Sequence, residues 1–332
     1  NRSFRDATGR NLKDLWREFA AERQASLAPA PSVNALTRRG AVQTTPRFSP
    51  DGKFIAYVSR GLKQAGEIRL MRADGTDDRR LCERLSGAGL SWSRDGASLL
   101  FDETDTVARF ESRSDLYRVE TTTGRRVRLT HGLRASDPDE GPAGPNGEPP
   151  EVIFVRRFED RSELARLAPD GAVRTLTQSE PGVEWSRPRF SPSGRSVIAA
   201  RMAKGFVDLV VVDPGNGTVV EVTHDRALDA EPSWLDEDGV VFRSDREGET
   251  FRLFLADVTS RRISRVVGPP DAAFSPDARA GALVFAHYSS RGYDLARAPL
   301  VRGEAAGEYR DAFPEALPDP QASDAPAKPY SV

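Results

Sequence analysis

The sequence has few of the features that tie a protein to a disulfide framework, a membrane or nucleic acid. Cys82 is the only cysteine in 332 residues, so intramolecular disulfides are excluded. No apolar run approaches the about 20 residues that a membrane-spanning helix needs. The 48 basic and 50 acidic residues leave a formal net charge of −2, which favours no basic surface for nucleic acid. We therefore expect a soluble, monomeric chain that binds no nucleic acid and does not insert into a membrane.

The motifs of common catalytic sites are absent as well. The sequence has no His-Glu-x-x-His zinc-peptidase motif, no Gly-x-Ser-x-Gly nucleophile elbow and no glycine loop for phosphate. His131 and His224 follow equivalent predicted strand ends in two different repeats, where they cannot easily share one metal ion. His287, the third histidine, lies within a predicted strand and is interpreted as packed there. The sequence thus predicts no catalytic residue, no bound metal and no resident cofactor, and hence no enzyme within this segment.

What the sequence does contain is an internal repeat. Pro46–Tyr57 predicts a strand, a tight turn at Ser-Pro-Asp-Gly and a second strand, and degraded copies follow along the chain. The aromatic residues that lead the copies are 44, 98, 44 and 40 residues apart: Phe48, Trp92, Phe190, Trp234 and Phe274. A period of about 40–45 residues with four strands per repeat is typical of a β-propeller. We interpret the aromatics as packing between blades.

The order of the predicted strands indicates how the ring closes. The sixth repeat lacks a fourth strand, whereas a lone strand at Val33–Thr37 matches the repeat ends at Arg126–Thr130 and Val219–Thr223. Pairing the lone strand with the sixth repeat covers edges that would otherwise be exposed. We therefore expect an all-β fold, a six-bladed β-propeller of four-stranded antiparallel blades. Its N-terminal strand closes the last blade.

Three segments are predicted along the chain. Residues 1–32 hold one N-terminal α-helix over residues 8–27, with a narrow apolar stripe, and a linker. Residues 33–300 form the propeller, in which Pro138–Pro150 is expected to be a surface loop after the third inner strand. Residues 301–332, rich in Ala, Pro, Glu and Asp, are expected to form an extended tail.

The repeat resembles that of the TolB-like propeller family, also called the WD40-like repeat. The resemblance rests on Ser-Pro-Asp-Gly-Lys before an apolar strand, a third strand ending at Asp-Gly-Thr and a closing Leu-Thr strand, and it covers Val33 to Leu300. It implies a bacterial envelope protein, periplasmic or outer-membrane-associated; in TolB itself the propeller binds a lipoprotein partner near its central channel. Shorter resemblances at Ala7–Phe19 and Lys328–Ser331 imply an upstream gluzincin-type peptidase domain and a downstream outer-membrane barrel.

Residues just before or within the inner strands are the candidate binding residues, because that part of a propeller lies near the mouth of its channel. Acidic side chains there could bind Ca²⁺ through oxygen ligands or meet a basic partner; alternatively they are ordinary solvated charges. Trp185 interrupts the repeat pattern, and it could anchor a partner if exposed or pack locally. The candidates are Asp137, Asp139, Glu184, Trp185, Asp229 and Glu231.

Together these features favour a non-catalytic, TolB-like propeller. It would act as a scaffold in the cell envelope and bind a protein or peptide at the face of its central channel. Two alternatives remain open at this point. One is an accessory domain that gates substrate for a larger peptidase, and the other is a Ca²⁺-dependent propeller enzyme or lectin.

Overall fold

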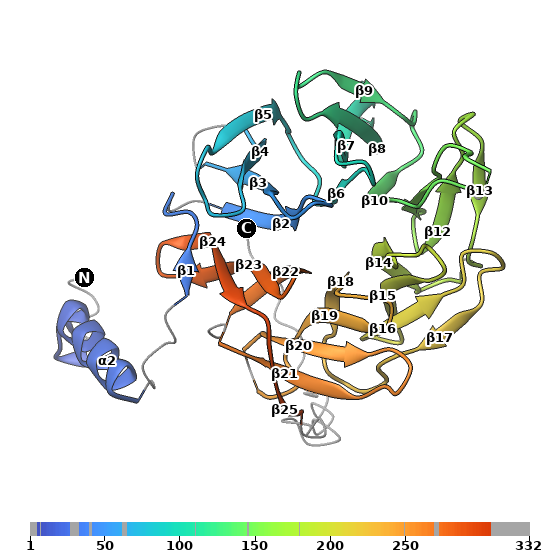
Figure 1. Cartoon of the computed structure of the whole chain (residues 1–332). Helices are drawn as coiled ribbons and strands as arrows, with labels where there is room; N and C mark the ends of the chain where they lie inside the picture. The colour runs from blue at the N-terminus through green and yellow to red at the C-terminus, as the bar shows by residue number, and fades with distance from the viewer. Residues whose placement is uncertain are drawn as a thin grey trace, which may run out of the picture.

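Antiparallel sheets arranged in a ring make up most of the molecule (Figure 1). The computed structural model describes residues 5–6, 8–26, 33–39, 42–61, 65–109, 111–144, 146–178, 180–248, 250–268 and 272–306. In chain order the strands of the ring are β2 (Val42–Phe48), β3 (Phe54–Arg60), β4 (Glu67–Arg72) and β5 (Arg79–Glu83); β6 (Leu90–Trp92), β7 (Ser98–Ala108), β8 (Glu111–Glu120) and β9 (Arg126–Arg128); β10 (Ala135–Glu140), β11 (Val152–Arg157), β12 (Ser162–Leu167) and β13 (Val173–Thr175); β14 (Glu184–Phe190), β15 (Val197–Ala203), β16 (Phe206–Val212) and β17 (Val219–Glu221); β18 (Ala230–Trp234), β19 (Gly239–Ser244), β20 (Arg252–Asp257) and β21 (Ile263–Val267); and β22 (Ala273–Arg279), β23 (Ala282–Ser289) and β24 (Gly292–Pro299).

The first strand of each group lies innermost in the ring (Figure 1). These inner strands neighbour one another in chain order, from β2 through β6, β10, β14 and β18 to β22, and β22 lies beside β2 again. The fold is therefore an all-β propeller, as the sequence predicts. One eight-stranded sheet combines the first and last groups, which are linked by a single parallel pair between Val42 and Tyr293.

The N-terminal strand β1 (Asn34–Ala35) pairs with β24, at Asn34 with Arg297 and at Ala35 with Ala296. The contacts just after it repeat those at the ends of the other groups. The Leu295 backbone N–H donates to Thr37 Oγ1 at 2.8 Å. Leu116, Leu164 and Leu209 donate in the same way, each at 2.9 Å, to Thr130, Thr177 and Thr223. Thr37 thus takes the place that a fourth-strand threonine holds elsewhere.

A β-bulge interrupts most of the inner strands at the same point. The pairing register shifts between Thr44 and Arg47, and at corresponding places in β10, β14, β18 and β22. The extra residue of each bulge has a positive φ that non-glycine residues seldom adopt. These residues are Thr45, Asp137, Arg187, Glu231 and Ser275, with φ between 48° and 56°. The residue two positions later then points in an equivalent direction in every strand.

The bulges correct two sequence predictions. Phe274 precedes the bulge of β22 as Thr44 precedes that of β2, so its predicted equivalence with Phe48 is wrong and Ala278 takes that position. Pro138, Asp139 and Glu140 belong to β10, so the predicted loop begins after them. In both cases a Ser-Pro or Asp-Pro step that suggests a turn lies inside a bulged strand.

The hydrophobic core lies between neighbouring sheets. One cluster joins Ile55 and Tyr57 of β3 to Val284 of β23, and another joins Leu100 of β7 to Phe154 of β11. Phe48, Trp92, Phe190 and Trp234 are all buried, which agrees with their predicted packing role. The indoles also bind the neighbouring sheet, because Trp92 Nε1 donates to the Arg47 carbonyl at 3.0 Å and Trp234 Nε1 donates to that of Arg189 at 2.8 Å.

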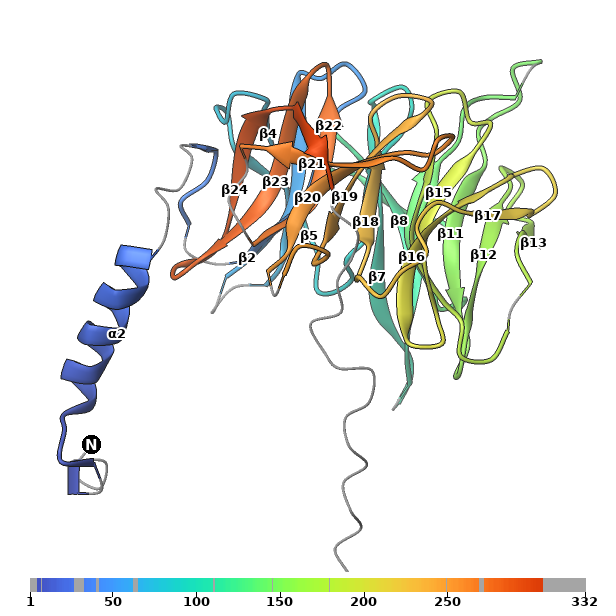
Figure 2. The same cartoon turned by 90° about the horizontal axis from the view of Figure 1, so that it is seen from below.

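Two elements lie outside the repeat pattern. Helix α2 (Leu12–Ser26) stands apart from the sheets (Figure 2), and Trp16 on its apolar stripe is 66% exposed. Strand β25 (Val301–Ala305) pairs antiparallel with β21, so the segment predicted as a tail begins with a strand. The rest of that tail and the linker before residue 33 lie outside the described residues. No helix in the described part of the chain is long and apolar enough to cross a membrane.

Candidate functional site

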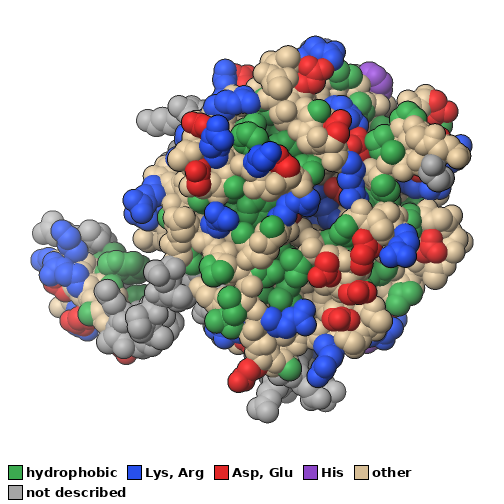
Figure 3. All heavy atoms as spheres, in the orientation of Figure 1, with side chains coloured by type: hydrophobic (Ala, Val, Ile, Leu, Met, Phe, Trp, Pro, Cys, Tyr) green, Lys and Arg blue, Asp and Glu red, His purple; other side chains and the backbone are tan. Residues whose placement is uncertain are grey.

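A cavity of about 320 Å³ lies at the end of the channel where the inner strands finish. The side chain two positions after each bulge residue lines it, together with Ser91 of β6, which has no bulge, and residues of the turns that follow β2, β6 and β14. In Figure 3, Lys and Arg side chains lie in the hollow at the middle of the ring. The lining residues contributed by this repeat position, in ring order, are Arg47, Ser91, Asp139, Arg189, Ser233 and Asp277.

The order Arg, Ser, Asp therefore occurs twice around the ring. Arg189 in the second half forms an ion pair with Asp139 of the preceding sheet, while its Nε has no hydrogen-bond partner among the described residues. Arg189 Nη1 lies 2.9 Å from Asp139 Oδ1, and Nη2 donates to the Leu90 carbonyl at 2.7 Å. Asp139 Oδ2 also accepts the Phe190 N–H at 2.9 Å. The charges of Arg189 and Asp139 thus compensate each other.

Arg47 in the first half lacks such a partner. Its Nη1 donates to the Pro46 and Pro276 carbonyls at 3.0 and 3.1 Å, but no carboxylate oxygen of the described residues lies within 4.0 Å of it. Asp277, the counterpart of Asp139, instead accepts the Phe48 N–H at 2.8 Å and the Ser233 hydroxyl. Arg47 is 3% exposed, and its Nε and Nη2 have no hydrogen-bond partner among the residues that the structure describes.

Burial, followed by the charge of Arg189, lowers the pKa of Arg47 to about 9. Transfer of a guanidinium out of water disfavours its charged form, and a second cation nearby acts in the same direction. Arg187 adds to this effect, whereas Asp277 and Glu231 oppose it without reversing it. The cavity end of the channel therefore holds a buried cation whose charge the protein does not fully compensate.

At the opposite end of the channel, the bulge residues line a second cavity of about 350 Å³. Arg187 Nη1 lies 3.4 Å from Asp137 Oδ1 and donates to the Ala88 carbonyl at 2.7 Å. Glu231 Oε2 lies 2.9 Å from Arg243 Nε and accepts the Ser275 N–H at 2.7 Å. Burial raises the pKa of Glu231, but Arg243 and Arg187 outweigh it and hold that pKa below its ordinary value. Of the predicted candidates Glu231 lines this cavity, and Asp137 and Glu231 are each paired with an arginine.

Two of the predicted candidates lie away from the channel cavities. Glu184 forms an ion pair with Arg157 at 2.8 Å. Trp185 is 2% exposed and packs in a core cluster with Val183 and Phe190, so it cannot anchor a partner on the surface. Local packing, the alternative that the sequence left open, describes Trp185.

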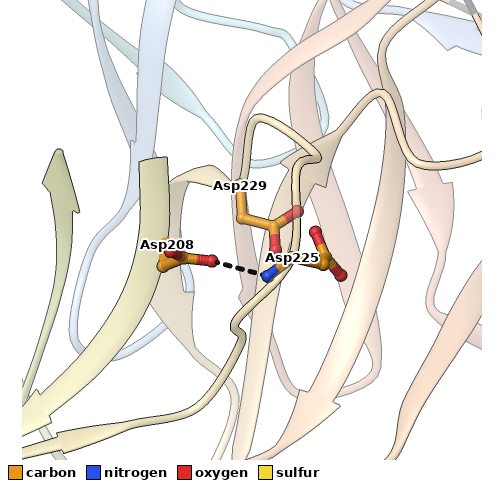
Figure 4. A group of neighbouring side chains, drawn as sticks. All are labelled: Asp208, Asp225 and Asp229. Carbon is orange, nitrogen blue, oxygen red and sulfur yellow. Dashed lines mark hydrogen bonds between the residues drawn. The ribbon is translucent and has the colours of Figure 1, made fainter. Parts of the chain in front are cut away.

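Asp229 lies in an acidic cluster with Asp208 and Asp225, whose oxygen atoms lie within 4.8 Å of one another (Figure 4). Arg246 already meets this charge, with Nη2 at 2.6 Å from Asp229 and Nη1 at 3.3 Å from Asp225. Asp208 accepts the Asp225 N–H at 3.2 Å. Asp229 is fully buried, and burial raises its pKa to about 6. A cation entering this cluster would have to displace Arg246.

Sequence reasoning overlooked the arginines of the channel. Arg47 and Arg189 both stand in a Pro-Arg-Phe-Ser-Pro segment of the repeat, and that shared position could have drawn attention to them. The acidic candidates were selected because carboxylates suggest cation binding. In the folded chain each acidic candidate forms an ion pair with an arginine of another strand or turn.

Comparisons with known proteins bear on the fold and on whether similar propellers occur in enzymes. No protein-family model matches the sequence. The uncharacterized peptidase YuxL of Bacillus subtilis (strain 168) is 26% identical over 156 residues, which is 47% of this chain and 21% of that protein. A putative TolB from Agrobacterium tumefaciens is similar in structure, with a TM-score of 0.57 and 18% identity over 80% of this chain and 93% of that one.

A puromycin-hydrolyzing peptidase of Mycobacterium tuberculosis has the same TM-score of 0.57, with 12% identity over 85% of this chain and 56% of that one. The chain thus spans about half of this peptidase, and its match with YuxL covers about a fifth of that protein. The likeness to solved structures shows a TolB-like propeller fold. The prediction that the chain is no enzyme is wrong on these comparisons, because propellers similar to it occur in peptidases.

Proposed function

We propose that this chain is a polypeptide-binding propeller that admits peptide substrates to a peptidase. The observation that carries the proposal is the polar cavity at the channel end, which is framed by Arg47, Arg94, Arg189 and Arg279. Concave sites with a few convergent polar groups are where ligands bind most often. The similarity to YuxL and to a puromycin-hydrolyzing peptidase supports peptides as the ligand class.

The ring has six blades in this proposal. The eight-stranded sheet counts as two blades, because a single parallel pair between Val42 and Tyr293 joins its halves. The contacts of Thr37 with β24 support the N-terminal strand as the closing strand of the last blade. The resemblance to the TolB-like family supports a periplasmic or outer-membrane-associated location for the protein.

Peptide binding is tested with a tryptic digest of casein, labelled with a fluorophore, by fluorescence anisotropy. The substitution Arg279→Cys places a thiol at the exposed rim of the cavity, where a bulky maleimide would block the opening. Native Cys82 is buried, and burial raises its pKa to about 11, so it should react slowly. Arg174→Cys on the exposed outer strand β13 is the matched control.

We expect labelled peptides to bind the parent chain and the maleimide-modified Arg174→Cys variant, but not the modified Arg279→Cys variant. In the full natural protein, the same modification at the rim should slow cleavage of the peptides. The proposal fails if no peptide of the digest binds the parent. It also fails if the blocked rim leaves binding unchanged, since the peptide would then occupy another surface.

A further inference from the structure

The channel cavity contains a buried edge of a guanidinium that no group of the described chain uses. Arg47 Nε and Nη2 are buried without a hydrogen-bond partner, while Nη1 is held by two backbone carbonyls. Buried charged groups in proteins are almost always paired, because leaving water without compensation is costly. The Nε and Nη2 donors are parallel and in one plane, which matches the two oxygens of a carboxylate.

The second half of the ring provides an internal comparison. Arg189 stands at the same repeat position as Arg47, and its guanidinium binds Asp139. Asp277, which corresponds to Asp139, has both oxygens engaged by the Phe48 N–H and the Ser233 hydroxyl. Arg189 thus has a carboxylate partner at this repeat position, whereas Arg47 has none, although Nε lacks a hydrogen-bond partner among the described residues in both.

The charge around the cavity also favours an anion. Four arginines and three acidic residues line it, and two of the acids are already committed, Asp139 to Arg189 and Glu140 to Arg118. Burial and the charges of Arg189 and Arg187 lower the pKa of Arg47, and Asp277 and Glu231 oppose this without reversing it. A bound negative charge would reverse that effect.

We propose that Arg47 binds a carboxylate of the incoming polypeptide, at a chain end or on an acidic side chain, through its Nε and Nη2 edge. The inference rests on the proposed function, because it names the group by which the channel recognises a peptide. Ser91 and Ser233 are the small side chains of the same ring of cavity-lining residues. They leave room for the chain that bears the carboxylate.

The test uses the peptide of the casein digest that binds the parent chain most tightly. It is synthesised as the free acid, as the C-terminal amide, and with each acidic side chain replaced by its amide. Isothermal titration calorimetry then compares these forms on the parent chain and on Arg47→Gln, Arg47→Lys and Arg174→Gln. Arg174 is exposed on β13, so its variant controls for a general loss of positive charge.

We expect one amide form to bind the parent at least about tenfold more weakly than the acid. Arg47→Gln should bind both forms alike, Arg47→Lys should keep part of the preference, and Arg174→Gln should keep all of it. The form that loses affinity tells a chain-end carboxylate from a side-chain carboxylate. Equal binding of all forms by the parent would overturn the inference while the proposed function stands.

A second measurement does not depend on finding a peptide. Melting temperatures are compared in sodium acetate and in sodium chloride of equal ionic strength. Acetate should raise the melting temperature of the parent and of Arg174→Gln, but not that of Arg47→Gln, since ligands that bind the folded state stabilise it. Equal effects of acetate on the parent and Arg47→Gln would overturn the inference. Circular dichroism confirms that each variant is folded.

Discussion

At the scale of single residues, Arg47 differs from the other buried arginines of the ring. Arg189 and Arg246 each have a side-chain nitrogen within 3 Å of a carboxylate oxygen. Among the described residues, the Arg47 side chain donates only to backbone carbonyl oxygens. A carbonyl carries a partial charge, so it satisfies a donor without balancing a cation. Burial of the unpaired Arg47 guanidinium therefore costs free energy, whereas the equivalent Arg189, three sheets later, is paired with Asp139.

This cost predicts a pH dependence of stability. Burial lowers the pKa of Arg47 to about 9 in the folded chain, so the unfolded state binds more protons between about pH 9 and the ordinary pKa of an arginine. Stability then rises with pH through that window. Relative to Arg47→Gln, the parent should gain about 2 kcal/mol in free energy of unfolding between about pH 9 and pH 10.5.

Urea denaturation at a series of pH values measures this difference, and the common titrations of Tyr and Lys cancel in the comparison. Parallel curves for the parent and Arg47→Gln would show that Arg47 keeps its ordinary pKa in the folded chain. A parent that loses stability relative to the variant would give the opposite sign and contradict the burial argument.

At the scale of elements, Thr37, which follows the short strand β1, fastens the N-terminal segment to β24 by side-chain hydrogen bonds. Thr37 Oγ1 accepts the Leu295 N–H and donates to Asp294 Oδ1 at 2.9 Å. Thr223 Oγ1 accepts the Leu209 N–H in β16, within a blade formed from continuous chain. Replacement of either threonine by valine leaves a buried N–H without its partner.

We therefore expect Thr37→Val to lower the free energy of unfolding by about 1–3 kcal/mol, as much as Thr223→Val does. Thermal and urea denaturation of the two variants measure the comparison. If Thr37→Val melts like the parent while Thr223→Val is destabilised, the N-terminal strand does not hold the last sheet as the structure indicates.

Elements also show what the sequence could predict and where it failed. The strand at Val33–Thr37 was foreseen because Leu-Thr recurs at strand ends, and the propeller was foreseen from the period. The assignment of the last repeat was shifted by four residues, because Phe274-Ser-Pro-Asp277 imitates the turn motif of Pro46–Gly52. In the fold those residues form a bulge, and a bulge depends on pairing with β23, which local sequence does not reveal.

The candidate site was predicted less well than the fold, for a related reason. Which side chains face the channel depends on the bulge of each inner strand, since one extra residue changes the face to which the next residues point. Asp139 lines the channel cavity, although the sequence predicts it in a loop and the structure places it in β10. Nothing in the local sequence marks Arg47 as a channel residue. Its burial follows from ring closure, which brings the inner strands together.

At the scale of the whole molecule, the ring of sheets has two kinds of surface: the outer strands and the polar channel in the middle. The outer strands β9, β13 and β17 are short and largely exposed. The channel is polar, and arginines line the cavities at both of its ends. Such an interior can admit an extended polypeptide while the packed cores between sheets stay intact, which is the central claim for this protein.

Photo-crosslinking tests that claim most directly. A casein peptide that binds the chain is made with a benzophenone amino acid beside its carboxylate, irradiated with the protein, and mapped by mass spectrometry. We predict crosslinks within the cavity lining, at residues such as Phe48, Arg94 and Arg279, and their loss when excess unlabelled peptide competes. Crosslinks confined to the outer strands or to α2 would contradict the claim that the channel binds the polypeptide.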